Sequence, residues 1–231
     1  MFVRHDYSPV MLLYRRAALA CPELVKEILT LRIADFGLEP NGERGLPGDP
    51  AFRKNGWWHY MLARYFFAGS LFCRNKRVLE LCSGLGWGAR IISHYAAEVT
   101  GLELDAEVVD RAGKMWAGSE SLRFISGDAL AASEQARGAF DVVLGMEAIE
   151  HFTRDDACRL IGQAHNLLAP AGVFIASSYY ADTREQAERA LTETNNPYHL
   201  YLFTKEEIGG VCAGLFPEVH IYGDLLLLAG K

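Results

Sequence analysis

The chain has 231 residues, of which 50% are hydrophobic and 23% are charged, and its 23 Lys and Arg against 29 Asp and Glu give a net charge of −6. This length fits one large domain, or a core domain with added elements, and the composition excludes long disordered tracts, collagen-like repeats and coiled coils. Because an acidic chain repels phosphate backbones, we expect no nucleic-acid partner.

The first part of the chain is predicted to be a helical extension. An apolar, periodic stretch over residues 9–36 and a Gly- and Pro-rich loop over residues 37–50 precede an aromatic, helix-like stretch over residues 57–72. Ligands of α/β proteins bind at one end of the sheet, and an extension of this kind is most economically placed over that end as a lid. We therefore divide the chain into residues 1–75, the extension, and residues 76–231, the core domain.

The core domain alternates short apolar runs with amphipathic segments, which is typical of a parallel α/β sheet. Predicted strands cover residues 77–82, 98–103, 122–126, 140–146 and 173–178, and predicted helices cover residues 87–96, 106–117, 130–136 and 154–168. A capping box from Thr204 to Glu207 opens a further helix, and Gly223-Asp224 then splits two apolar runs within residues 218–228, which favours an antiparallel hairpin. The predicted fold class is α/β, a doubly wound, mostly parallel seven-stranded sheet with an antiparallel C-terminal hairpin.

A glycine-rich loop follows the first strand of this sheet. Residues 77–82 run into Ser83-Gly84-Leu85-Gly86-Trp87-Gly88-Ala89 and then into a helix. Glycines allow the backbone to turn tightly and approach a ligand, and the start of a helix offers free N–H groups. Glu103, 19 residues after Gly84, ends the next strand, where a carboxylate can accept both hydroxyls of a ribose. The pattern predicts a cofactor that contains adenosine.

Two families of cofactor fit this loop. Gly84-x-Gly86-x-x-Ala89 matches the dinucleotide fingerprint and would make the protein a nicotinamide-dependent oxidoreductase. Gly84-x-Gly86-x-Gly88 preceded by Glu80 resembles motif I of class I S-adenosylmethionine-dependent methyltransferases. Glu80, Cys82 and Trp87 depart from the most common form of that motif, without removing a group that it needs.

Further motifs favour the methyltransferase resemblance, which covers residues 41–230. Similar motifs are Ser126-Gly127-Asp128-Ala129, Phe140-Asp141-Val142-Val143 and the turn from Leu167 to Val173. A narrower likeness, to bacterial methyltransferases associated with surface-polysaccharide pathways, is carried by Gly42-Glu43-Arg44 with Pro47, by residues 59–68, and by Asn196-Pro197-Tyr198-His199 with Phe203. The resemblance implies a Rossmann-like methyltransferase fold with S-adenosylmethionine as cofactor.

The resemblance also assigns the residues that line the cofactor. The Gly84–Gly88 loop would hold the methionine part, Glu103 the ribose, and Asp128 with Ala129 the adenine. The full set of predicted cofactor-binding residues is Glu80, Cys82, Ser83, Gly84, Leu85, Gly86, Gly88, Glu103, Leu104, Asp128, Ala129, Met146 and Glu147.

Two histidines are candidates for the general base. Methyl transfer is an in-line displacement, so the enzyme mainly positions the acceptor and, for a hydroxyl, removes its proton. His151 follows the fourth strand at the edge of the sheet where ligands bind, and an imidazole with a pKa near ~6.5 suits this task. His199 lies in the insertion after the fifth strand and is the second candidate. Structural roles, a helix cap for His151 and an ordered turn for His199, remain the alternatives.

Glu147, Glu150 and His151 form a Glu-x-x-Glu-His pattern. It resembles a metal-associated motif of quinone-biosynthesis O-methyltransferases, and two carboxylates with an imidazole suit a divalent ion. Two or three neighbouring groups rarely hold an ion without further ligands, so we expect no bound metal.

The predicted acceptor is a small molecule or a saccharide. Trp57, His59, Tyr60 and Tyr198 are the predicted substrate-binding residues, although aromatic residues at helical spacing also suit a core. The leading function is O-methylation dependent on S-adenosylmethionine. The alternatives are a nicotinamide-dependent oxidoreductase and a methyltransferase-like module that binds a partner without catalysis. The sequence gives no signal for the oligomeric state.

The expected compartment is the cytoplasm. The five cysteines, Cys21, Cys73, Cys82, Cys158 and Cys212, are scattered and lack the spacing of a zinc site. A reducing compartment is therefore the simpler interpretation. The N-terminus is charged where a signal peptide would be apolar, and no apolar stretch approaches the ~20 residues that cross a bilayer. We therefore expect no membrane insertion.

Overall fold

The structure is a computed structural model. It describes residues 2–5, 16, 19–37, 45–50, 57–136, 139–222 and 226–231, with the backbone alone for residues 2–5, 57–59, 135–136 and 226–228. Residues 42–44, which carry part of the narrower family likeness, lie outside the described residues.

The described elements alternate between strands and helices through the core domain. The strands are β1 (Phe2–His5), β2 (Arg77–Leu81), β3 (Glu98–Glu103), β4 (Leu122–Ser126), β5 (Phe140–Met146), β6 (Leu168–Ser177), β7 (Glu218–Tyr222) and β8 (Leu226–Gly230). The α-helices are α2 (Pro22–Thr30), α4 (Trp57–Phe72), α5 (Trp87–Ser93), α6 (Ala106–Met115), α7 (Ser133–Ala136), α8 (Arg154–Leu167), α9 (Arg184–Thr194) and α10 (Lys205–Ala213). Short 3₁₀ helices are η1 (Ile33–Phe36), η2 (Ala129–Ala131) and η3 (Ile149–His151).

All the described strands join one sheet, in the order β1-β7-β8-β6-β5-β2-β3-β4. Strands β2 to β6 are parallel to one another, and β8 is antiparallel to both β6 and β7. The predicted fold class, with seven strands and an antiparallel C-terminal hairpin, is confirmed. β1 adds an eighth strand, parallel to β7, at the edge of the sheet. The prediction of a helical extension is therefore wrong for Phe2–His5.

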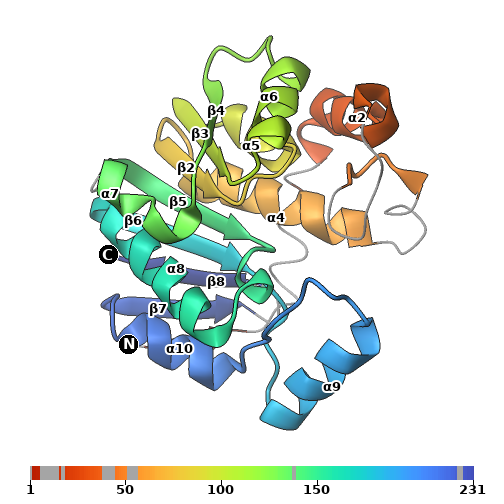
Figure 1. Cartoon of the computed structure of the whole chain (residues 1–231). Coiled ribbons are helices and arrows are strands. Elements are labelled where there is room, and N and C mark those ends of the chain that lie inside the picture. The colour runs from red at the N-terminus through yellow and green to blue at the C-terminus, as the bar shows by residue number, and fades with distance from the viewer. Residues whose placement is uncertain are drawn as a thin grey trace.

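Side chains of the sheet alternate between two apolar cores, because successive residues of a strand point to opposite faces. Val78, Val99 and Val142 pack with α2, α4, α5 and α6 on one face. Leu79, Val143 and their neighbours pack with α8 and α10 on the other face. Figure 1 shows these two helical layers and the position of α9, which stands apart from the sheet at lower right.

Helix α4 is a core element, although it belongs to the predicted extension. Phe66 and Ala68 are fully buried, and Arg64 is only 1% exposed. Gly69 and Gly88 allow this close packing, since a Cβ on either would lie 2.3 Å or less from the ring of Tyr95 or Tyr65. A helix that is apolar on nearly all sides is typical of such a buried position.

Several predicted boundaries moved by a few residues, since α5 ends at Ser93 and α6 ends at Met115. Two strand boundaries moved for local reasons. Strand β2 ends at Leu81 rather than residue 82, because Cys82 has a positive φ of 55° that begins the glycine loop. Strand β6 begins at Leu168 rather than residue 173. The residues of the predicted turn between Leu167 and Val173 belong to this strand, and the extra residues produce a register shift in its pairing with β5. Within the described ranges, no helix combines the length and the apolarity that crossing a bilayer requires.

Candidate functional site

The predicted ligand-binding edge lies where β2 and β5 end side by side. The two strands are parallel neighbours, with Glu80 paired to Leu144. From β2 the chain proceeds to β3 and β4 on one side, and from β5 to β6 on the other. Such a switch in strand order leaves a crevice at the carboxyl ends of the strands, which is where ligands of α/β sheets bind. The predicted cofactor and acceptor residues follow these two strands.

The three glycines of the loop have different surroundings. Gly84 and Gly86 adopt positive φ angles of 53° and 73°, which glycine tolerates best. A Cβ on Gly84 would meet nothing within 4 Å, whereas a Cβ on Gly86 would lie 2.2 Å from Phe124, and one on Gly88 would lie 2.2 Å from Tyr65. Gly84 therefore faces open space, while Gly86 and Gly88 allow neighbouring rings to pack against the loop.

Glu103 holds the loop from the end of β3. Its carboxylate accepts hydrogen bonds from the backbone N–H of Gly84, at 3.0 Å, and from that of Asp105, at 3.1 Å. A carboxylate has about four acceptor positions, so it can accept further donors from a ligand. The structure thus brings Glu103 and Gly84 together, as the sequence predicted.

On the predicted adenine side, apolar side chains and the carboxylate of Asp128 are exposed. Leu104 is 71% exposed and Ile125 is 42% exposed. Asp128 is exposed and caps η2 by accepting the N–H of Leu130 at 2.8 Å, while Ala129 behind it is buried. These positions suit a flat ligand whose rim carries a hydrogen-bond donor.

Glu80 lies beneath the loop rather than at its surface. It is 2% exposed, and its carboxylate accepts a hydrogen bond from the hydroxyl of Tyr65 on α4. Burial raises the pKa of Glu80 to about 8, against the effects of the hydrogen bonds from Tyr65 and from the backbone of Ala89. Glu80 thus links α4 to β2 and supports the loop from below.

We expect this buried carboxyl to make stability depend on pH. The usual pKa of Glu80 is 4.5, so between pH values of about 5 and 8 the unfolded chain has lost a proton that the folded chain keeps. The free energy of unfolding should therefore fall as the pH rises through this window, by up to about 1.4 kcal/mol per pH unit. Urea unfolding between pH 5 and pH 9 measures this slope.

In the Glu80→Gln variant, the free energy of unfolding should lack the fall with pH that Glu80 causes in the natural chain. Glu98→Gln, a change at an exposed position on β3, should keep it. Parallel pH curves for the natural chain and Glu80→Gln would contradict the shift.

Met146 ends β5, and Glu147 follows it. Met146 is 6% exposed. Glu147 has a φ of 51°, forms an ion pair with Arg64 of α4 and accepts a hydrogen bond from the hydroxyl of Ser177 at 2.8 Å. Arg64 also donates to Ser177 at 3.1 Å. This network ties α4 to the ends of β5 and β6.

His151 and His199 lie together, although one follows β5 and the other follows α9. Their ring centroids are 5.2 Å apart in an edge-to-face arrangement. Backbone contacts fix this pairing, because the N–H of Leu200 donates to the carbonyl of Glu150 at 2.8 Å, and Nδ1 of His151 lies 3.1 Å from the carbonyl oxygen of Tyr198. Both rings are half-buried. The two predicted catalytic residues thus form one imidazole pair.

The buried carboxyl group of Glu150 lies close to both imidazoles. It is 3% exposed, and one of its ligand oxygens lies within 4.8 Å of a ring nitrogen of each histidine. Burial, with a smaller contribution from the charge of Glu147, raises the pKa of Glu150 well above its usual range.

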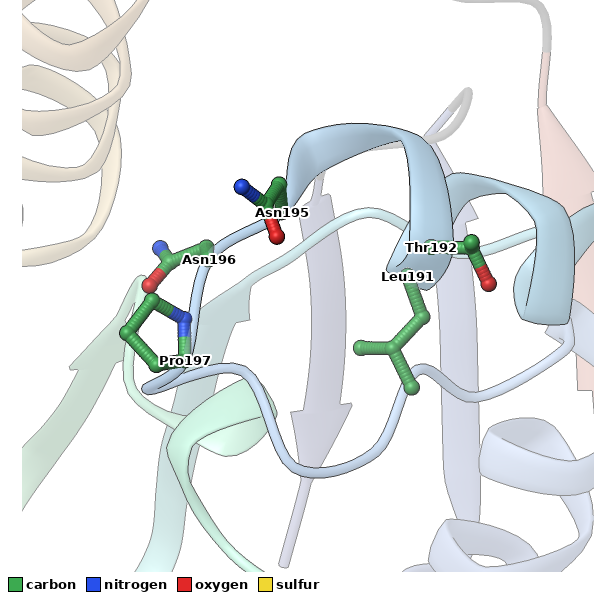
Figure 2. A pocket seen from close by; sticks show the side chains of 5 residues that line it. All are labelled: Leu191, Thr192, Asn195, Asn196 and Pro197. Atoms are coloured by element: carbon green, nitrogen blue, oxygen red, sulfur yellow. The ribbon is translucent and has the colours of Figure 1, made fainter.

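The predicted substrate residues divide between described and undescribed side chains. Tyr60 and Tyr198 are 39% and 47% exposed, and Tyr198 adjoins the imidazole pair. The side chains of Trp57 and His59 lie outside the described part of the structure. A hollow of about 470 Å³ opens where α9 ends. Figure 2 shows the side chains that line it. The hollow is lined by Leu191, Thr192, Asn195, Asn196 and Pro197.

The sequence analysis missed the partners that arrange the site. Arg64, Tyr65 and Ser177 hold Glu147 and Glu80 in place. Arg64 and Tyr65 stand within the aromatic stretch of residues 57–72, but nothing in the local pattern indicates their partners, which are distant in the sequence.

The described site also fits the predicted cofactor. Gly84 opens to free space, Leu104 presents an exposed apolar surface, and Oγ of Ser83 is buried beside the loop with no hydrogen-bond partner. Residues 78–172 match the family model of a methyltransferase domain. This stretch includes the glycine loop, Glu103 and His151, and it supports the methyltransferase interpretation of the loop over the dinucleotide one. This match supports S-adenosylmethionine as the predicted cofactor.

Two curated relatives are named as methyltransferases. A phosphoethanolamine N-methyltransferase of Plasmodium falciparum is 26% identical over 138 residues, which are 59% of this chain and 52% of that protein. A probable S-adenosylmethionine-dependent methyltransferase of Mycolicibacterium smegmatis is 27% identical over 137 residues, 59% of this chain and 50% of that protein. The chain spans about half the length of these relatives.

A solved structure supports the fold. The PH0226 protein of Pyrococcus horikoshii superposes with a TM-score of 0.59 at 21% identity, over 80% of this chain and 92% of that one. At this identity the likeness concerns the fold alone.

Proposed function

We propose that the protein is an S-adenosylmethionine-dependent methyltransferase that methylates a hydroxyl group of a small molecule or a saccharide. The observation that carries the proposal is the imidazole pair of His151 and His199, which lies at the end of β5, the strand that neighbours the one leading into the glycine loop. A hydroxyl needs help to lose its proton, whereas a free amine needs less, so a pair of imidazoles at this edge favours an oxygen acceptor.

The roles of the remaining residues follow from their positions. The open face of Gly84 and the carboxylate of Glu103 would hold the cofactor, together with Leu104 and Asp128 on the adenine side. S-adenosylmethionine supplies an electrophilic methyl group bound to positively charged sulfur. An imidazole of His151 or His199 would orient the acceptor hydroxyl and take up its proton.

The surroundings of the imidazole pair support a polar acceptor. Asn195 and Asn196 line the hollow at the end of α9 and offer amide donors and acceptors. Tyr198, next to them, is 47% exposed and adds an aromatic surface. Amides beside an aromatic ring suit a saccharide, whose hydroxyls form hydrogen bonds and whose C–H faces pack on rings. We propose that residues 1–75 cover this edge of the sheet through α4.

All five cysteines are free thiols. This supports a reducing compartment, and we propose that the enzyme acts in the cytoplasm.

Calorimetry with S-adenosylhomocysteine, the demethylated product, tests the proposal, with NADH as a parallel ligand. We expect saturable binding of S-adenosylhomocysteine alone, and then methyl transfer to hydroxyl acceptors in a screen of nucleotide sugars, glycolipid precursors and phenols. Binding of NADH alone would instead make the protein an oxidoreductase. Cofactor binding without turnover on any acceptor class would favour a non-catalytic module.

A further inference from the structure

The group formed by Glu150, His151 and His199 has the arrangement of metal ligands. One carboxylate oxygen and one nitrogen from each ring all lie within 4.8 Å of one another. An ion about 2.1 Å from each ligand atom separates those atoms by no more than about 4.2 Å, so small side-chain rotations would close the site around it. The three groups converge on one point from two separate segments of the chain.

Glu150 presents an unpartnered buried oxygen within this group. Its Oε2 atom is buried and has no hydrogen-bond partner, and one oxygen of the same carboxyl group lies within 4.8 Å of a nitrogen of each imidazole. A buried carboxylate oxygen is costly unless it is paired, and an ion is one of the few groups that explain such an atom in a folded protein. Glu147 does not fill this role, because its carboxylate is engaged by Arg64 and Ser177.

His151 is oriented by a backbone carbonyl. Its Nδ1 lies 3.1 Å from the carbonyl oxygen of Tyr198, which can only accept a hydrogen bond. In the tautomer that donates this hydrogen bond from Nδ1, the ring nitrogen that can bind an ion is Nε2. Histidines that bind metals characteristically donate their other N–H to a carbonyl or a carboxylate in this way.

The backbone fixes the third ligand in place. The carbonyl of Glu150 accepts the N–H of Leu200 at 2.8 Å, so the residue next to His199 is attached directly to the segment that carries Glu150 and His151. The cluster is thus built into the fold and does not depend on the rotation of a loose loop.

We propose that Glu150, His151 and His199 bind a divalent transition-metal ion such as Zn²⁺. Two imidazoles favour such an ion over Mg²⁺ or Ca²⁺, which prefer oxygen ligands. Three protein ligands leave a position open, as in catalytic zinc sites, and the half-buried rings give access to it. This differs from the pattern in the sequence, because His199 takes the place of Glu147.

The chemistry of the ion rests on the proposed methyl transfer. An acceptor hydroxyl in the open position would have its pKa lowered by the ion and would release its proton to solvent. Its oxygen would then form a bond to the methyl carbon as the bond from carbon to sulfur breaks, and the sulfur would keep that electron pair and become a neutral thioether. The histidines would act as ligands in this form of the enzyme.

The test uses the full, tag-free chain, stripped of metal with a chelator and dialysed. Titration with Co²⁺, followed by visible absorption, and calorimetry with Zn²⁺ measure binding without any turnover. We expect one ion per chain with micromolar affinity or tighter. Glu150→Gln and His199→Ala should each weaken binding by at least about 100-fold, since even the loss of a partner behind a ligand costs 10- to 100-fold.

His94→Ala is the matched control, because His94 is exposed and follows α5, near the end of the sheet where β2 begins. Its metal affinity should equal that of the natural chain. Absence of a Co²⁺ spectrum, or equal affinity in the site variants and the control, would overturn the metal site. S-adenosylhomocysteine binding, measured on every sample, shows that the variants are folded. If the natural chain binds S-adenosylhomocysteine but no metal ion, only the proposed metal site is refuted. If the natural chain does not bind S-adenosylhomocysteine, the proposed function is refuted.

Discussion

His151→Ala is expected to slow methyl transfer by roughly 10²- to 10⁴-fold, while the affinity for S-adenosylhomocysteine changes by less than about twofold. His151 follows β5 and is held by the carbonyl of Tyr198, while Glu103 and Gly84, which would hold the cofactor, lie at the ends of β3 and β2. Removal of the imidazole therefore affects the acceptor and leaves the cofactor residues in place. Single-turnover kinetics and calorimetry measure the two quantities separately.

The control for this prediction is His94→Ala, which removes an exposed imidazole near the end of the sheet where β2 begins. Its turnover should equal that of the natural chain. The predicted loss holds whether His151 takes the proton itself or holds an ion that lowers the pKa of the acceptor. Equal turnover of His151→Ala and the natural chain would remove His151 from the mechanism.

Glu103→Ala is expected to weaken the binding of S-adenosylhomocysteine by roughly 100-fold or more, because each hydrogen bond to a charged carboxylate contributes about 1.5–3 kcal/mol. The carboxylate also accepts the N–H of Gly84 and that of Asp105, so its loss loosens the loop that would hold the methionine part. Both effects act in the same direction. Calorimetry with S-adenosylhomocysteine measures the change.

Glu98→Ala is the matched control, since Glu98 is an exposed carboxylate at the other end of β3. It changes the net charge by the same amount and should leave the affinity unchanged. Equal affinities of Glu103→Ala and Glu98→Ala would refute the role of Glu103.

The order of strands and helices in the core domain was predictable because burial imposes a regular pattern on the sequence. Runs such as Val142 to Leu144 must be apolar where helices cover both faces of a sheet, and glycines or prolines mark the ends of many such runs. Boundaries moved where single residues adopted unusual conformations, as Cys82 does with its positive φ. Strand β1 was missed because four residues at an edge carry too little pattern to distinguish them from an extended terminus.

The candidate site was predictable only where its residues are neighbours in the sequence or follow adjacent strands. The glycine loop and Glu103 belong to consecutive β–α units, so their proximity follows from the fold class. The pairing of His151 with His199, and of Arg64 with Glu147, depends on how distant segments pack. No local pattern encodes such contacts, and the unpartnered oxygen of Glu150 becomes visible only in three dimensions.

The contacts of helix α4 also constrain how this sequence can evolve. Tyr65 reaches Glu80 and occupies the space that a side chain on Gly88 would need, while its neighbour Arg64 pairs with Glu147. A substitution at any one of these five positions removes a hydrogen-bond or ion-pair partner from a neighbour or places two groups in one volume. We therefore expect these five positions to vary together among homologues. If α4 is replaced by the corresponding helix of a homologue, the protein should fold only when the matching acidic residues and the glycine are transferred with it.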